Sequence, residues 1–148
     1  MGMFDSLNVS ASGLTAERLR MDVAAENLAN AQSTRGADGG PYRRKEVLLE
    51  EAPGHGGFGA QLRTAMTSSS GSPGGVRVAG IAEDPTPPRR SYDPTHPDAD
   101  PQGYVNLPNV DTVAEMVDLI TASRGYEANV TAMQSAKQMF AKTLEILR

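Results

Sequence analysis

The sequence lacks cysteine and is poor in aromatic residues. Its 148 residues include no Trp, three Phe and four Tyr, an aromatic content of 5%. The absence of cysteine excludes disulfides, thiolate zinc sites, iron–sulfur clusters and cysteine nucleophiles. The low aromatic content argues against a dense globular core built by this chain alone. The net charge of −4 argues against a nucleic-acid partner, because proteins that bind nucleic acid usually carry a basic surface.

Proline is absent from both ends of the chain. All ten prolines lie between Pro41 and Pro108, and twelve of the fifteen glycines lie between Gly36 and Gly103. Proline breaks helices and glycine weakens them, so the ends are predicted to be helical and the middle is not. We therefore expect three segments: an N-terminal helix over 1–31, an extended, hairpin and loop segment over 32–110, and a C-terminal helix over 111–148.

Long apolar runs are also absent. No run reaches eighteen apolar residues, so no direct membrane insertion is expected. A cleaved secretory signal needs a basic residue near its start and an apolar block after it. This sequence has no Lys or Arg before Arg18 and no apolar block after it. We expect that if the protein leaves the cytoplasm, it uses a route that keeps its N-terminus intact.

Apolar residues instead recur with a seven-residue period at both ends. This 3–4 spacing places a narrow apolar stripe along a helix, as in the seam of a coiled coil. The predicted fold is mainly α, with a small β and loop-rich middle, and its long terminal helices pair as a coiled-coil-like hairpin. The predicted packing positions are Phe4, Leu7, Ala11, Leu14, Met21 and Leu28 in the first helix, and Met116, Leu119, Tyr126, Val130, Met133, Phe140, Leu144 and Leu147 in the last.

A second apolar stripe, formed by Val113, Val117 and Ile120, widens the apolar face where the last helix begins. An ordinary two-helix core would explain a single stripe. A lone hairpin with two stripes leaves apolar surface in water, and such patches mark partner sites. We therefore expect one face to pack within the chain and another against a neighbouring chain. A freestanding coiled-coil adaptor is the alternative.

Short strands are predicted in the middle segment, over 44–50 and 75–83, with edge pieces over 91–93 and 104–107. Thr112 and Glu115 match the S/T-x-x-E capping box, which predicts a helix start there. The basic stretches at 43–45 and 89–90 are too short for a nucleic-acid groove. We expect them to meet acidic residues of neighbouring subunits.

Candidate chemical sites are few. Gly54–Gly59 matches the G-x-G-x-x-G pattern of nucleotide-binding loops, but no βαβ unit can surround it, so a flexible loop is the favoured interpretation. Asp93, His96, Asp98 and Asp100 offer metal-ligand atoms, yet interleaved prolines and the lack of a distal Glu favour a solvated acidic turn. No catalytic residue, metal or cofactor is predicted.

Several short motifs together are specific. The stretch A-E-N-L-A-N-A at 25–31 closely resembles the N-terminal signature of bacterial flagellar rod and hook proteins, and 39–43 (G-G-P-Y-R) resembles a stretch of their proximal rod members. Matching motifs also occur at 103–105, 108–111, 115–117, 122–124 and 126–130. The resemblance covers roughly the first 50 and last 60 residues and omits about 52–75. Gly125 departs from the family pattern and should weaken its helix by about 1 kcal/mol.

This resemblance implies a non-enzymatic structural subunit of the proximal rod of the flagellar basal body, located in the periplasm. Its 1–31 and 111–148 segments would be rod helices that pack into a helical tube and transmit motor torque. The flagellar type III apparatus would export it without a cleaved signal. The expected partners are further copies of itself, the rod proteins FlgB, FlgF and FlgG, and the base protein FliE. Family termini tend to order on assembly, so protease should trim a free monomer to about 32–110.

The rod signature comprises Asn27, Leu28, Ala29 and Asn30. Asn27 and Asn30 fall where the first helix is expected to end, and short amides can satisfy the free carbonyls of a last turn. We favour this role. The two residues could also fix the turn into the middle segment and touch a neighbour, which is compatible with the first role.

Overall fold

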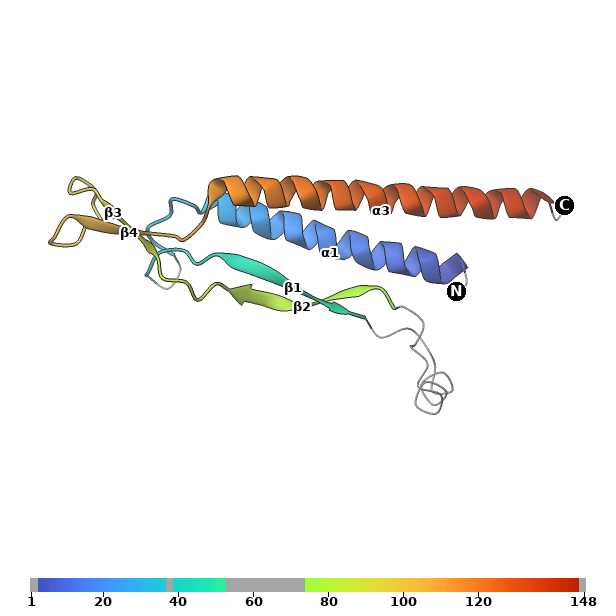
Figure 1. Cartoon of the computed structure of the whole chain (residues 1–148), viewed down its shortest axis with the longest axis horizontal. Coiled ribbons are helices and arrows are strands. Elements are labelled where there is room, and N and C mark those ends of the chain that lie inside the picture. Colours follow the sequence, from blue (N-terminus) through green and yellow to red (C-terminus); the bar gives the residue numbers. More distant parts are fainter. Residues whose placement is uncertain (1–2, 37–38, 53–73, 147–148) are drawn as a thin grey trace, which may run out of the picture. The chain divides into compact units, whose positions relative to one another are not determined.

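Two long helices and a small β middle make up the described part of the chain (Figure 1). The computed structural model describes residues 3–36, 39–52 and 74–146. Its elements are α1 (Met3–Ala29), β1 (Lys45–Glu51), β2 (Val76–Glu83), β3 (Arg89–Tyr92), β4 (Tyr104–Leu107) and α3 (Thr112–Ile146). The prediction of two long terminal helices around a small β segment is confirmed. Among the described residues, no helix combines the length and apolarity needed to cross a membrane.

The strands form two separate two-stranded sheets, β1 with β2 and β3 with β4. β3 and β4 are antiparallel, with Arg89 opposite Leu107 and Tyr92 opposite Tyr104. The rings of this last pair meet edge to face at 5.3 Å. β3 begins two residues before the predicted edge piece, because Arg89 and Arg90 also pair with β4. The Gly54–Gly59 motif and most of the predicted 52–75 loop lie outside the described residues.

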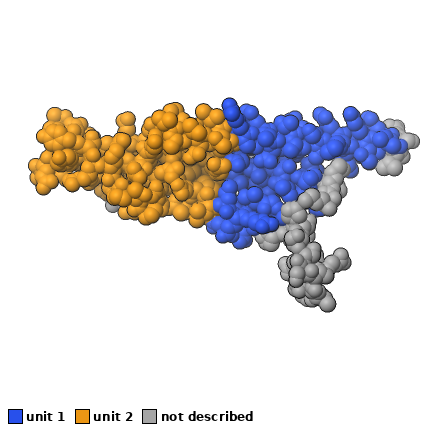
Figure 2. Space-filling model, in the orientation of Figure 1, with its two compact units in different colours: residues 1–18, 49–79, 123–148 blue, residues 19–48, 80–122 orange. Residues whose placement is uncertain are grey.

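The chain divides into two compact units, and each helix contributes residues to both (Figure 2). Unit 1 comprises residues 1–18, 49–79 and 123–148, and unit 2 comprises 19–48 and 80–122. The prolines of the described middle segment that follow β2 all fall in unit 2.

In unit 1 the two helices approach closely at small residues. A Cβ on Gly13 would lie 2.9 Å from Nδ2 of Asn129, and one on Gly125 would lie 3.2 Å from Cδ of Glu17. These two contacts run in opposite directions along the helices, so α1 and α3 are antiparallel in this unit. The hydroxyl of Ser12 accepts a hydrogen bond from the Val76 amide at 3.1 Å, which ties the start of β2 to α1.

Apart from Pro108, the buried apolar residues of unit 2 are small or β-branched. Those on or just after α1 are Val23, Ala24 and Ala31, and those of the other segments are Val105, Val110 and Ala122. Larger aliphatic and aromatic side chains of this unit are at least partly exposed in the described residues. The small side chains bring the backbones close together and leave little apolar area to stabilise the unit.

The start of α3 differs from its predicted cap. Asp111 is the N-cap residue, since its Oδ1 accepts the amide of Val113 at 2.9 Å and that of Ala114 at 3.4 Å. The predicted capping box of Thr112 and Glu115 is wrong, because the Glu115 side chain turns inward to other partners. The helix then continues through Gly125 to Ile146.

Candidate functional site

A buried polar network joins the last turn of α1, the start of β1 and the first turn of α3, all within unit 2. We call its five members, Asn27, Tyr42, Arg44, Lys45 and Glu115, the polar clasp. Asn27 and Glu115 are 1% and 2% exposed, and they are the buried polar residues of the described chain. Buried polar groups cost free energy unless they are hydrogen-bonded, so their partners decide whether this network stabilises the unit.

The amide of Asn27 uses its full hydrogen-bonding capacity. Its Nδ2 donates to the carbonyl of Lys45 at 2.9 Å and to Oε2 of Glu115 at 3.0 Å. Its Oδ1 accepts from the amide of Lys45 at 3.0 Å and from the hydroxyl of Tyr42 at 2.9 Å. An asparagine amide has two donors and two acceptor lone pairs, and all four are occupied here. Asn27 therefore holds the first residue of β1 by both of its main-chain groups.

The carboxylate of Glu115 accepts a second hydrogen bond from the opposite side. Arg44 Nε donates to Oε1 of Glu115 at 2.6 Å, and the same guanidinium also pairs with Glu46. Burial alone would lower the pKa of Arg44, but the hydrogen bond and charge of Glu115, with those of Glu46, raise it. The buried negative charge thus has a charged partner, which offsets the cost of removing it from water.

Tyr42 and Lys45 close the network on its exposed side. Burial and the Glu26 carboxylate raise the pKa of Tyr42, which keeps its hydroxyl protonated and able to donate to Asn27. Lys45 Nζ pairs with Oε1 of Glu26 at 2.6 Å and lies 5.6 Å from the centre of the Tyr42 ring. Within the chain, Arg44 and Lys45 of the basic stretch at 43–45 already meet acidic residues, and contacts of this stretch with neighbouring subunits stay a prediction. Arg90 likewise pairs with Asp100 at 3.5 Å.

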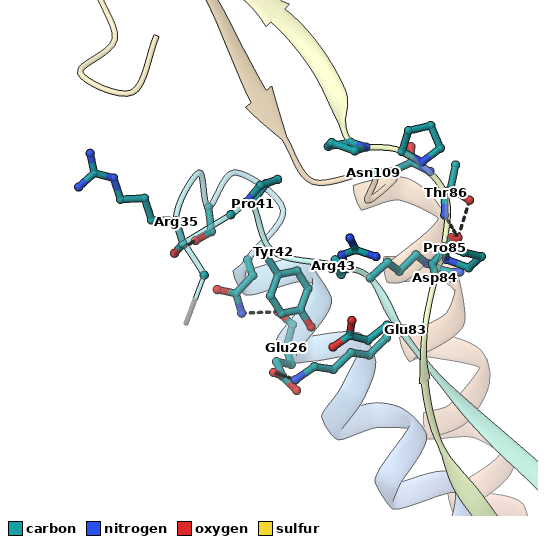
Figure 3. A pocket seen from close by; sticks show the side chains of 18 residues that line it. Glu26, Arg35, Pro41, Tyr42, Arg43, Glu83, Asp84, Pro85, Thr86 and Asn109 are labelled. Atoms are coloured by element: carbon teal, nitrogen blue, oxygen red, sulfur yellow. Dashed lines mark hydrogen bonds and ion pairs between the residues drawn. The ribbon is translucent and has the colours of Figure 1, made fainter. Parts of the chain in front are cut away.

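An open cleft of about 890 Å³ lies beside the clasp (Figure 3). Tyr42 and Glu26 line one side, and Glu83, Asp84 and the proline-rich turn after β2 line the other. Asp84 Oδ1 accepts the amide of Thr86 at 2.8 Å, which fixes this turn. The lining mixes both signs of charge, and its Lys45 and Glu26 pair with one another, so the cleft shows no single ligand chemistry.

The side chains of the acidic turn at 93–100 form hydrogen bonds and ion pairs with other residues of the chain. Asp98 accepts the Thr34 hydroxyl at 2.8 Å and pairs with Arg35, and these groups lower the pKa of its carboxyl. Asp93 accepts the Thr95 hydroxyl at 2.7 Å, and Nδ1 of His96 accepts the amide of Asp98 at 3.1 Å. Within the described ranges, no three His, Asp or Glu side chains are grouped as metal ligands.

The predicted packing residues that the structure describes are half-buried or exposed, and none is fully buried. The Phe4 side chain and Leu147 are outside the description; Leu7, Leu14, Met21, Leu28, Leu119, Tyr126, Val130 and Met133 are half-buried; and Ala11, Met116, Phe140 and Leu144 are exposed. The buried helix positions are instead mostly small or polar, among them Ala16, Ala24, Asn27, Glu115 and Ala122, with Val23 as a larger one.

The two signature asparagines have different roles. Asn30 Nδ2 donates to the carbonyl of Glu26 at 2.9 Å, as expected for an amide at a helix C-terminus. Asn27 bonds no carbonyl of its own helix among these contacts and holds β1 and α3 instead. Sequence reasoning missed Glu115, Arg44 and Lys45 as its partners. Glu115 lies outside both predicted apolar stripes, and the capping box offered a local explanation for it.

The second apolar stripe is exposed on α3. Val113, Val117 and Ile120 are 62%, 57% and 52% exposed, with Met116 beside them. Glu115 and Ala122, which lie on the opposite side of the same helical turns, are buried. This part of α3 therefore has two faces, one packed within the chain and one apolar and open.

Comparison with known proteins identifies the class to which this fold and signature belong. Residues 7–37 match the family model for flagella basal body rod proteins, and residues 102–146 match that for the C-terminal region of flagellar basal body rod FlgEFG proteins. The chain belongs to the flagellar basal-body rod protein family, whose members are part of the basal-body rod.

Three curated relatives match over nearly their full length, and each is named flagellar basal-body rod protein FlgC. The Bacillus subtilis protein is 50% identical and the alignment covers 99% of both chains. The Borreliella burgdorferi protein is 46% identical over 100% of this chain and 99% of its own. The Salmonella typhimurium protein is 40% identical over 99% and 98%.

Proposed function

We propose that this chain is a structural, non-enzymatic subunit of the proximal rod, and that it transmits motor torque through contacts between packed subunits. Its rod helices would lie in 1–31 and 111–148 and its connecting segment in 32–110. The flagellar type III apparatus would export it, and its neighbours would be copies of itself, FlgB, FlgF, FlgG and FliE. Family membership and the full-length similarity to rod proteins support this proposal.

The observation that carries the packing role is the open apolar face of α3. Val113, Val117 and Ile120 stand more than half exposed beside one another on a helix whose other face is already occupied. Burying one such side chain contributes about 1.5–3 kcal/mol, so three of them form an effective contact surface. A neighbouring subunit that covers them would explain why the chain leaves them in water.

The test replaces Val117 and Ile120 with Asp. Because both side chains are exposed, the purified double variant should keep the wild-type helix content while rod assembly fails in the cell. Thr121→Asp, an exposed polar position on the same turns, is the matched control and should assemble. Electron microscopy of basal bodies provides the readout. Complete rods in the double variant would refute the packing role.

The adaptor alternative is separated by deleting the whole chain. A rod subunit should be required for the rod to be completed, so the deletion strain should lack finished hook–basal bodies. An adaptor that binds outside the rod would leave them complete in the same micrographs.

A further inference from the structure

We propose that the polar clasp is a register lock: it fixes the positions along which α1 and α3 pair. It does so within the isolated chain by holding the C-terminal end of α1 and the N-terminal end of α3 to β1. The inference concerns the fold of the single subunit and does not depend on its assembly into a rod. It predicts that the stable part of the free chain extends past 32–110 to include Asn27 and Glu115.

The first argument is that the apolar heptads cannot set the register by themselves. A repeat of seven residues is satisfied again when one helix slides by seven positions along the other. Sliding α3 in this way would place either Ala122 or Pro108, which precedes the helix, opposite Asn27 in place of Glu115. Neither side chain can accept the Nδ2 hydrogen, and Arg44 would lose its carboxylate. The clasp therefore distinguishes registers that the apolar stripes treat alike.

The second argument is that one amide controls three segments at once. Asn27 reaches Lys45, 18 positions away in the chain, and Glu115, 88 positions away. Its side-chain oxygen and nitrogen pair with the amide and carbonyl of one residue of β1, as a neighbouring strand would. Asp lacks the donor and Leu lacks both groups, so the chemistry of position 27 is specific.

The test is a double-mutant cycle on the purified full chain, followed by thermal unfolding. In Asn27→Asp two carboxylates would face each other across the 3.0 Å gap. In Glu115→Gln an amide oxygen that accepts from Arg44 leaves the amide nitrogen, which is a donor, facing the Nδ2 donor of Asn27. Each single variant should lower the Tm by about 5–10 °C. In the double variant the introduced glutamine can donate to the introduced aspartate and accept from Arg44, so at least half of the summed loss should return.

The controls are Asn8→Asp and Glu127→Gln, which make the same chemical changes at exposed positions and should leave the Tm within about 2 °C. Additive losses in the double variant, or single variants that unfold like the wild type, would overturn the proposal.

Hydrogen exchange measured by mass spectrometry gives a second readout. It reports each segment separately, so it can be used even if a variant is partly unfolded. In the wild type, amides of 24–29 and 115–122 should be protected together with those of β1. In Asn27→Leu, protection should fall at least tenfold in these three segments and remain unchanged in β3 and β4. Fast exchange of 24–29 and 115–122 in the wild-type monomer would contradict the lock.

Discussion

The two units hold α1 and α3 together in different ways. In unit 2 a buried carboxylate, an amide and a guanidinium join the helices through directed hydrogen bonds. In unit 1 the helices approach closely at Gly13 and Gly125, which lie against the side chains of Asn129 and Glu17. Directed bonds specify partners and register, whereas small-residue contacts mainly specify distance. The comparison indicates that directed hydrogen bonds contribute to the pairing of the two helices in unit 2, and that small residues set their separation in unit 1.

The largest effect is expected from removing the acid of the clasp. Glu115→Ala should lower the free energy of unfolding by about 3 kcal/mol, because Arg44 and Asn27 would both lose a buried partner. Urea unfolding followed by circular dichroism measures this. Glu127→Ala, an exposed glutamate on the same helix, should change the value by less than about 0.5 kcal/mol. Equal losses of unfolding free energy at positions 115 and 127 would show that the buried glutamate of unit 2 has no special role in holding the helices together.

A smaller effect is expected at the close contact in unit 1. Gly13→Leu should destabilise the chain by about 1–3 kcal/mol, since even its Cβ would overlap the Asn129 side chain. Adding Asn129→Ala should restore part of the loss by making room, and urea unfolding of both variants would show it. A Gly13→Leu variant as stable as the wild type would show that Gly13 is not needed for the close approach of the two helices.

The smallest effect concerns the acidic turn of unit 2. The Thr34 hydroxyl and Arg35 lower the folded-state pKa of Asp98, so its ionised form favours the folded turn. The stabilisation should be complete above the ordinary pKa of 3.8 and be lost as pH falls through the lower folded value. Amide chemical shifts at Thr34 should follow this titration. Asp98→Asn should abolish it, and Asp22→Asn should leave it intact.

Local sequence patterns predicted the elements well. The exclusion of proline from both ends located the helices, and Val and Leu runs bounded by turn residues located β1 and β2 to within one residue. These signals succeed because proline restricts the backbone locally and because the period of apolar residues follows the geometry of the element.

The same patterns could not predict the clasp. Asn27, Arg44 and Glu115 are far apart in the chain, and each has an ordinary local explanation as a helix end, a basic stretch or a cap. Only the folded arrangement shows that these explanations fail together. Likewise, the spacing of leucines marked an apolar stripe but could not show that small residues, offset from it, form the buried faces.

The way Asn27 holds β1 has a consequence for sequence tolerance. Its amide contacts only main-chain atoms of residue 45, so this contact places no demand on the side chain there. Every residue except proline, which lacks the required N–H, can be recognised equally. Substitutions at position 45 therefore keep the contact with Asn27 and lose only the ion pair with Glu26 and the contact with the Tyr42 ring. A library randomised at 45 should yield folded chains far more often than one randomised at 27.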